Sequence, residues 1–180
     1  AYAKNKGKEF YINPKNEIVV PPIYEELALF SEGILCAKKK GKFGFINNEG
    51  KEIIPFVYDY PSYFWQNKLC VVSKNKKYGV INLKGETVMD FVYKSIKNPR
   101  KDNILAASLN DKYAFFDITG KRLTDYSYDD VICDSNCNYL FINDVAIAKK
   151  GYKFTLINKL FSPIFENNEF DSISVFDTFS

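Results

Sequence analysis

The feature that most constrains this chain is a segment that recurs in register. Its clearest copy, "KFGFINNEGKEIIP", begins at Lys42, and looser copies begin at Lys77 and Lys112. A period of about 35 residues predicts an array of supersecondary units that bury their apolar faces against one another. An Asn or Asp closes the first apolar stretch of each copy, at Asn13, Asn47, Asn82 and Asp117, and after a longer interval at Asn158.

Three short strands are predicted in each unit. In the second unit they are "KFGFIN", "IIPFVY" and "KLCVVSK", and the other units have relatives of each. The turn between the first two strands ends at Gly50, Gly85 or Gly120, where glycine adopts a positive φ at little cost. Asn16 takes that place in the first unit. Pro55 cannot donate a hydrogen bond to a strand ladder, so the second strand must end, bulge or lie at an edge near it.

The first strand carries apolar groups on both faces. A ring at Phe43 or Tyr78 is followed directly by Gly44 or Gly79, and Ile46 lies two residues beyond Gly44. Because successive side chains of a strand point to opposite faces, we expect this strand to be the inner, doubly covered one. The small residue beside the ring indicates that another segment or ring packs closely over that spot. The high aromatic content, 17%, also favours strands.

These patterns predict an all-β fold. It is a tandem array of three-stranded antiparallel β-meander repeats with a period of about 35 residues, elongated or superhelically twisted. The rotation between repeats, which decides between an open array and a barrel or propeller, is left open by the sequence. The last unit lacks the turn glycine and has Phe161 there, as expected either of a cap or of a shortened chain. We expect a single repeat domain over residues 1–180, with units at about 8–40, 41–75, 76–110, 111–151 and a partial 152–180.

The recurring residues resemble the bacterial WG repeat, also called the KWG repeat. The resemblance is carried by "KFGFIN" from Lys42, "GKEIIP" from Gly50, Tyr58-Asp59 and "FSEG" from Phe30, and it covers about residues 8 to 176. It implies non-catalytic, all-β modules that often stand beside other domains and share no catalytic residues. The tryptophan of the signature is replaced in this chain by Phe43, Tyr78, Tyr113 and Phe154.

Little in the sequence points to chemistry. The chain has no histidine, the usual general base and commonest metal ligand, and none of the glycine-rich phosphate-binding or nucleophile motifs. Glu25-Glu26 and Asp129-Asp130 follow the repeated tyrosine, where Asp59 also falls. A repeated acidic position beside a turn is interpreted as a backbone acceptor rather than an acid–base pair. We therefore predict no enzymatic activity and no cofactor.

The four cysteines give no firm indication of redox compartment. Cys36 and Cys70 lie in apolar stretches and are expected to be buried free thiols. Cys133 and Cys137 are interpreted as two thiols on a solvated loop, while a small disulfide loop or half a metal site stays open. A zinc site is not expected, because the chain has no second close cysteine pair and no histidine.

Lysines recur at the turns between the third and first strands. The net charge of +3 permits an acidic partner without requiring one. The favoured interpretation is that these lysines keep strand edges soluble. The alternative is a polyanion-binding surface, such as one for nucleic acid. We call the six candidate residues the lysine ridge: Lys38, Lys39, Lys40, Lys74, Lys76 and Lys77.

Two aromatic side chains in the second unit are not explained by the repeat. Tyr60 and Trp65, the only tryptophan, stand where the first unit has the polar residues Glu26 and Ser31. Large rings at positions that the repeat fills with polar groups are expected to be exposed, and such rings are common at binding hot spots. The competing interpretation is that Trp65 covers a local gap. Neighbouring Tyr63 and Phe64 match apolar positions and are predicted to lie in the core.

The predicted function is a binding or scaffold module that recognises a protein or glycan, with electrostatic polyanion binding as the alternative. No stretch is long enough to span a membrane. The chain starts at Ala1 without a methionine, so we expect the native N-terminus to be missing. The sequence leaves open whether the protein is cytoplasmic or exported, and also its oligomeric state and partner.

Overall fold

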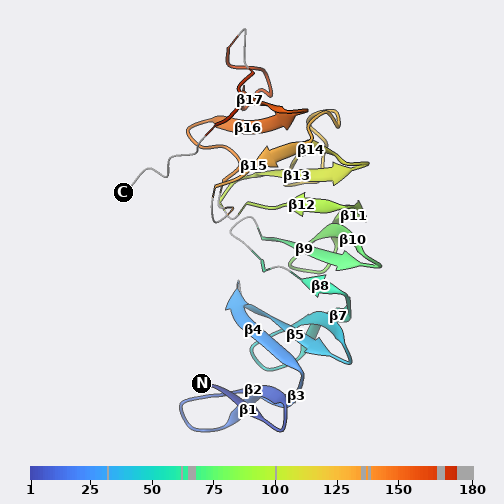
Figure 1. Cartoon of the computed structure of the whole chain (residues 1–180). Helices are drawn as coiled ribbons and strands as arrows, with labels where there is room; N and C mark the ends of the chain where they lie inside the picture. Colours follow the sequence, from blue (N-terminus) through green and yellow to red (C-terminus); the bar gives the residue numbers. More distant parts are fainter. Residues whose placement is uncertain are drawn as a thin grey trace. The chain divides into compact units, whose positions relative to one another are not determined.

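The computed structural model describes residues 1–31, 33–61, 63–64, 68–99, 101–134, 137, 139–165 and 169–173, and every regular element in these ranges is a β-strand. The chain divides into two compact units, Ala1–Phe91 (unit 1) and Val92–Ser180 (unit 2), and each is described separately. Small antiparallel sheets follow one another along the chain within each unit (Figure 1). The expected all-β architecture of short antiparallel sheets is confirmed.

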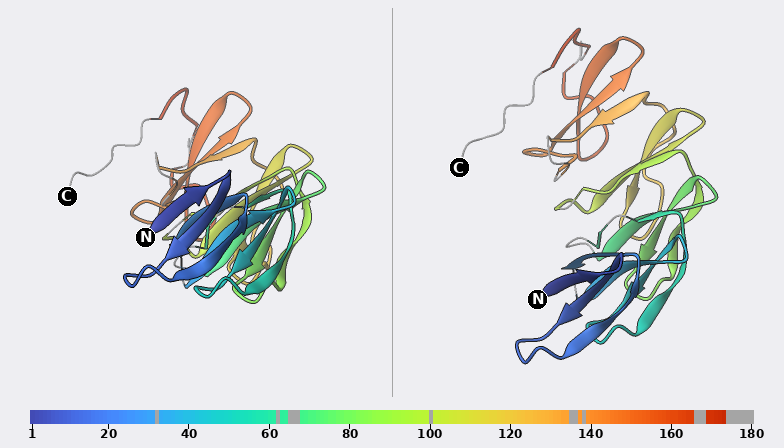
Figure 2. Two further views of the ribbon diagram at one scale, coloured as in Figure 1. Left: turned by 90° about the horizontal axis from the view of Figure 1, so that it is seen from below. Right: turned by 60° about the horizontal axis from the view of Figure 1, so that its bottom comes forward.

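Unit 1 contains three sheets, and the last strand, β11, ends just past Phe91. In Figure 2 the blue N-terminal sheet lies beside the light-blue and cyan sheet that follows it, and strands β2 and β3 contact β4 and β5. The first sheet is β1 (Tyr2–Asn5), β2 (Lys8–Ile12) and β3 (Ile18–Tyr24). The second is β4 (Glu26–Ser31), β5 (Ile34–Lys39), β6 (Lys42–Ile46) and β7 (Glu52–Tyr58). The third is β8 (Tyr60–Pro61), β9 (Leu69–Lys74), β10 (Lys77–Asn82) and β11 (Thr87–Tyr93).

Unit 2 contains two three-stranded sheets. Where the structure describes them, the segments that correspond to the outer strands of unit 1 pair here through isolated bridges, such as Tyr113 with Tyr128 and Phe154 with Phe170. One sheet is β12 (Ser95–Lys97), β13 (Ile104–Leu109) and β14 (Lys112–Asp117). The other is β15 (Asp130–Ile132), β16 (Val145–Lys150) and β17 (Lys153–Asn158).

Each sheet joins strands from two successive repeats of the sequence. The predicted third strand of one unit pairs with the first strand of the next through a two-residue hairpin, as β5 does with β6. Lys40 and Gly41 both have positive φ there, 53° and 74°, and Asn75 and Lys76 repeat the pattern at 54° and 62°. Turns with two positive φ values match the right-handed twist of the flanking strands. The segment predicted as a polar linker adds a strand before this hairpin, which is β4, β8, β12 or β15.

The tight turns between the first and second strands have the predicted geometry. Gly50, Gly85 and Gly120 have φ values of 77°, 79° and 84°, and Asn16 has 63°. The side chain that opens the turn holds it closed: Asn47 Oδ1 accepts hydrogen bonds from the amides of residues 49 and 51, at 3.0 and 2.9 Å. An Asx turn of this kind explains why Asn or Asp begins each connection and why a residue tolerant of positive φ ends it.

The small residue of the first strand lies under a bulge of the neighbouring edge strand. Phe43 pairs with Tyr58 and Phe45 with Ile54, so β7 has extra residues opposite Gly44. A Cβ at Gly44 would lie 2.8 Å from the Ile54 carbonyl oxygen and 2.9 Å from the Phe56 ring. The predicted close packing is confirmed. Pro55 lies in β7, which is an edge strand and has a bulge, in agreement with the prediction that this strand ends, bulges or lies at an edge.

The repeated tyrosines connect neighbouring sheets of unit 1. Tyr24 is buried, stacks on Phe56 with ring centroids 5.8 Å apart, and donates a hydrogen bond to the Gly50 carbonyl oxygen at 3.0 Å. Tyr58 stacks in the same way on Phe91, at 6.1 Å. Each sheet therefore covers part of the next with a ring from the repeated tyrosine. The hydroxyl of Tyr24 keeps a polar partner, as buried tyrosines usually do.

Candidate functional site

The predicted acidic positions cap the turns between the third and first strands. Glu25 accepts hydrogen bonds from the amides of Lys40 and Gly41, at 2.8 and 3.1 Å. Asp129 accepts one from the Gly151 amide at 2.7 Å. Asp59 does the same more weakly, at 3.4 Å from the amide of residue 76. The interpretation of this position as a backbone acceptor is confirmed.

These capping carboxylates are held ionised by their partners. The amides of Gly41 and Lys40 lower the pKa of Glu25 below its ordinary value. Lys42 lowers the pKa of Asp59, to which it is paired, and Lys112 lowers the pKa of Asp129 from 2.5 Å. Groups of this kind stay ionised near neutral pH and serve structure rather than proton transfer.

At the start of unit 2 the acidic and basic residues of this arrangement change places. Lys94 stands at the acidic position, and Asp111 stands in the turn that it faces. The two side chains form an ion pair, and the hydrogen bond from Lys94 lowers the pKa of Asp111. The attraction between the cap and the turn is therefore kept while its polarity is reversed.

The positive charge of the lysine ridge is partly offset by neighbouring acidic and aromatic groups. Lys38 pairs with Glu26 at 2.6 Å and lies over the Phe43 ring at 5.1 Å. Lys39 lies over the Phe56 ring at 5.8 Å. Cation–ring contacts and ion pairs hold these ammonium groups against the sheet. The other lysines of the ridge, Lys40, Lys74, Lys76 and Lys77, are exposed.

The aromatic candidates of unit 1 have different outcomes. Trp65 lies outside the described residues. Tyr60 lies in β8 and is 62% exposed, as expected of its position. Phe64 is buried, with its ring centroid 5.1 Å from that of Phe45, as predicted. Tyr63 was predicted to be core, and this is wrong, because it is 43% exposed.

The short length of β8 explains the outcome at Tyr63. The preceding sheet has a six-residue strand at this place, whereas β8 pairs only at Tyr60 and Pro61. Beyond Pro61 the repeat no longer determines which side chains point inward. Tyr60, Pro61 and Tyr63 line a cavity of about 320 Å³ together with Phe43 and apolar groups of β4 and β5.

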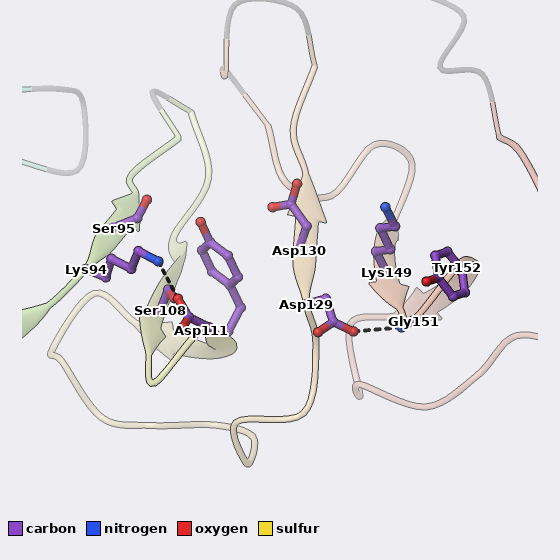
Figure 3. A pocket seen from close by; sticks show the side chains of 10 residues that line it. Lys94, Ser95, Ser108, Asp111, Asp129, Asp130, Lys149, Gly151 and Tyr152 are labelled. Atoms are coloured by element: carbon purple, nitrogen blue, oxygen red, sulfur yellow. Dashed lines mark hydrogen bonds and ion pairs between the residues drawn. The ribbon is translucent and has the colours of Figure 1, made fainter.

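A larger cavity, of about 810 Å³, lies within unit 2 between its two sheets (Figure 3). We call it the unit 2 groove. Lys94 and Ser95 lie on one side in Figure 3, Lys149 and Tyr152 lie on the other, and Asp130 lies between them. The lining residues are Lys94, Ser95, Ser108, Asp111, Tyr113, Asp129, Asp130, Lys149, Gly151 and Tyr152.

The unit 2 groove has room because two short side chains replace two long ones. Ser95 is the cross-strand partner of Ser108, whereas the corresponding pair in the second sheet is Glu26 and Lys38. The hydroxyl side chains occupy far less volume than an ion pair of long side chains. The sequence carries this signal, since Ser95 follows the repeated tyrosine at the same distance as Glu26. The prediction from sequence considered this position at Tyr60, Glu26 and Asp130 but missed Ser95.

Asp130 is anchored at one carboxylate oxygen. Its Oδ1 accepts hydrogen bonds from Lys97 Nζ at 2.7 Å and from the Val131 amide at 2.8 Å. Lys97 also donates to the Val131 carbonyl oxygen and lies over the Tyr113 ring at 5.3 Å. Within the ranges that the structure describes, no hydrogen bond reaches the Oδ2 atom of Asp130. The anchored carboxylate therefore presents one acceptor oxygen at the groove.

Tyr152 is a second residue that was not predicted from the sequence. It lies at the tip of the hairpin between β16 and β17 and is 95% exposed. Gly151, with φ of 58°, precedes it and is fixed by the bond to Asp129. Earlier copies of this turn have Gly41 or Lys76 at the tip. An aromatic ring at a polar or glycine position was the available signal.

The cysteines are free thiols. Cys36 and Cys70 are buried as predicted, and burial raises the pKa of Cys36 to about 12. The Cys137 thiol donates toward Cys133, which lowers the pKa of Cys133 to about 7 and raises that of Cys137. Among the described residues, no group of three or more acidic or cysteine side chains is arranged to hold a metal ion.

Comparison with known families decides the identity of the repeat. The WG containing repeat matches residues 10–43, 43–78 and 78–113. This chain belongs to the WG repeat family. The resemblance inferred from the motifs is confirmed, and WG repeats are a class of repeats rather than a family of enzymes. The described part of the chain has no helix long and apolar enough to cross a membrane.

One solved structure shows the same type of fold. A crystal structure of the eukaryotic initiation factor is 12% identical with a TM-score of 0.58, and the match covers 95% of this chain and 52% of that one. Hsv2 from Kluyvelomyces marxianus is 13% identical with a TM-score of 0.47, and the match covers 85% and 54%. The WG repeat chain thus spans about half the length of these structures. No curated protein matches its sequence.

Proposed function

We propose that this WG repeat chain is a non-catalytic binding or scaffold module that recognises a protein or a glycan. The observation that carries the proposal is the exposure of tyrosine rings at cavities between sheets. Tyr60 and Tyr63 line one cavity in unit 1, and Tyr152 lines another in unit 2. Exposed Tyr rings supply a large contact area at low cost in side-chain entropy.

The titratable groups near these cavities support a non-catalytic role. Asp111 and Asp129 are paired with lysines, and those pairs lower the pKa of both carboxylates. A general acid or base works best when its pKa lies near the working pH, and the chain has no histidine to supply one. Asp111 and Asp129 are therefore suited to accept hydrogen bonds rather than to exchange protons.

Polyanion binding is the less favoured function. The ammonium groups of Lys38 and Lys42 are paired with Glu26 and Asp59. A lysine whose charge is already paired displaces few counterions from a polyanion, so Lys38 and Lys42 add little to the sequence-independent attraction that such binding relies on. Capture of nucleic acid would contradict the favoured function.

Affinity capture on the full chain tests this proposal. The immobilised chain is incubated with separate pools of protein, glycan and nucleic acid, and bound material is eluted at rising salt. We expect a protein or glycan that persists at high salt, because contacts to Tyr rings are screened little. Retention of nucleic acid alone, lost steeply with salt, would establish the polyanion function instead. Retention of nothing would refute a binding role.

Three variants refine the test. Tyr60→Ala and Trp65→Ala should weaken retention if the aromatic candidates of unit 1 contact the partner. Each should change the free energy of unfolding by less than about 1 kcal/mol, as surface substitutions usually do. The control replaces Lys74, Lys76 and Lys77 with Gln and should leave retention unchanged. Loss of binding in the control alone would favour the lysine ridge.

A further inference from the structure

We propose that the unit 2 groove binds an uncharged saccharide, with Tyr152 as the stacking surface for a sugar ring. This inference rests on the proposed function and narrows its partner to a glycan. One face of a pyranose ring presents C–H groups, while its rim presents hydroxyl groups. A suitable site therefore combines an exposed aromatic ring with fixed hydrogen-bonding groups in a concave surface.

The backbone that carries Tyr152 is held before any ligand arrives. The Gly151 amide donates to Asp129 Oδ2 at 2.7 Å, and Lys112 donates to Asp129 Oδ1 at 2.5 Å. The hairpin tip is thus fixed to the start of β15 and the start of β14. Preorganised contact groups lose less entropy on binding. A ring that is 95% exposed at such a fixed tip contributes nothing to the core, so its placement favours an external contact.

Hydrogen-bonding groups lie at the same groove. Ser95 and Ser108 are cross-strand partners on one sheet, and Asp130 and Lys149 are cross-strand partners on the other. Asp130 engages Lys97 and the Val131 amide through Oδ1 alone. Hydroxyl, carboxylate and ammonium groups together can both donate to and accept from the hydroxyl groups of a sugar.

The charge balance of the groove favours an uncharged ligand. Each of the three carboxylates has a lysine partner: Lys94 for Asp111, Lys112 for Asp129, and Lys97 for Asp130. The remaining lysine of the lining, Lys149, lies over the Phe154 ring at 5.6 Å. A cationic peptide would find its counter-charges already paired, and a polyanion would meet these carboxylates. The cavity volume of about 810 Å³ lies within the range of small-molecule sites.

The test measures binding of uncharged oligosaccharides to the full chain. A panel of gluco-, manno-, xylo- and chito-oligosaccharides is screened by saturation-transfer NMR, and the dissociation constants of the hits are measured by calorimetry. We expect at least one member to bind with an affinity that changes little between low and high salt, because no net charge is involved. Tyr152→Ala should weaken that binding about tenfold, while Tyr152→Phe keeps the ring and the affinity.

Two further variants locate the site. Ser95→Leu should reduce binding by filling the groove from the opposite sheet. Tyr2→Ala, which removes an exposed ring from unit 1 outside both cavities, should leave saccharide binding unchanged. Saccharide binding that survives both Tyr152→Ala and Ser95→Leu, or that is lost in Tyr2→Ala, would overturn the assignment to this groove. Circular dichroism of each variant confirms that it is folded.

The possible failures are distinguishable. If no oligosaccharide binds but the capture experiment retains a protein, the saccharide inference is wrong and the binding function stands. If a basic peptide or a polyanion binds at the groove with steep salt dependence, the inference is also wrong. If neither saccharide nor protein binds, the inference and the proposed function both fail.

Discussion

Two glycines show how local surroundings decide the energetic role of a residue. Gly50 and Gly41 have nearly the same positive φ, 77° and 74°. A Cβ at Gly50 would lie 2.7 Å from Pro21 Cδ, whereas a Cβ at Gly41 would meet nothing within 4 Å. The turn at Gly50 is therefore constrained by backbone geometry and by the preceding sheet, and the hairpin at Gly41 by backbone geometry alone.

Substitution at these two positions should separate the two contributions. Gly41→Ala should cost about 1 kcal/mol of unfolding free energy, from the unfavourable φ alone. Gly50→Ala should cost about 2 to 3 kcal/mol, because Pro21 must also move. Urea unfolding of the two variants beside the parent chain gives both values. Equal costs would show that contact with Pro21 adds nothing.

At the scale of elements, the hairpin and its carboxylate cap act together. The caps at Glu25 and Asp129 join the start of one strand to the turn between the next two. Sheets that are short and open at an edge depend on such connections, because few ladder hydrogen bonds hold each strand. The reversed pair Lys94–Asp111 keeps an ion pair between this position and the turn, although a lysine cannot accept the amide hydrogen bonds that Glu25 and Asp129 accept.

Acid should weaken the fold through these caps. The folded-state pKa of Glu25 is lowered from its ordinary value of 4.5, and that of Asp129 is lowered from 3.8. A carboxyl with a lowered pKa contributes stability above its unfolded pKa and loses it as the pH falls through the folded value. We therefore expect stability to hold down to about pH 5 and to fall below it.

Urea midpoints measured from pH 6 downward, at steps of about half a unit, test this expectation. Glu25→Gln should be less stable at pH 6 and should lose less stability on acidification, since Gln has no charge to titrate. Asp129→Asn should behave likewise. If both variants follow the acid profile of the parent chain, the caps do not contribute to acid sensitivity.

At the scale of the whole molecule, the residues that the structure describes form five small sheets in place of one continuous sheet. Each unit has its own buried cluster, such as Phe45 with Ile54 and Cys70 in unit 1, and Phe115 with Tyr128 and Phe141 in unit 2. Repeat arrays of this kind gain most of their stability between adjacent repeats. Because the chain has two compact units, an unfolding experiment can show whether they unfold together.

A single repeat domain over residues 1–180 predicts one unfolding transition. Trp65, the only tryptophan, reports on unit 1 through its fluorescence, while far-ultraviolet circular dichroism reports on all strands. Coincident urea transitions by the two signals would agree with one cooperative domain. A fluorescence transition separate from the dichroism transition would show that the two units unfold independently.

Removal of metal ions should leave the fold unchanged. The chain has no histidine, and the described residues contain no group of three metal-ligating side chains. Addition of a chelator is therefore expected to leave the melting temperature of the chain unaltered. A large decrease would contradict this prediction and point to a metal bound through Cys133 and Cys137.

The sequence by itself determined the parts of this protein that depend on short-range geometry. The period, the positive-φ turns at Gly50, Gly85 and Gly120, the close packing at Gly44 and the WG repeat family all follow from residue types at fixed spacing. Turn chemistry and the alternation of side chains along a strand act over a few residues, so each copy of the repeat reports them directly.

Only the tertiary structure decided which strands of successive repeats pair with each other and where cavities remain. The strand before each hairpin forms because the hairpin that follows it leaves an open edge at β5, β9, β13 or β16. Tyr63 is exposed because β8 stops at Pro61, and the unit 2 groove opens because Ser95 and Ser108 meet across two strands. These features depend on which distant residues become neighbours, a property that no single copy of the repeat contains.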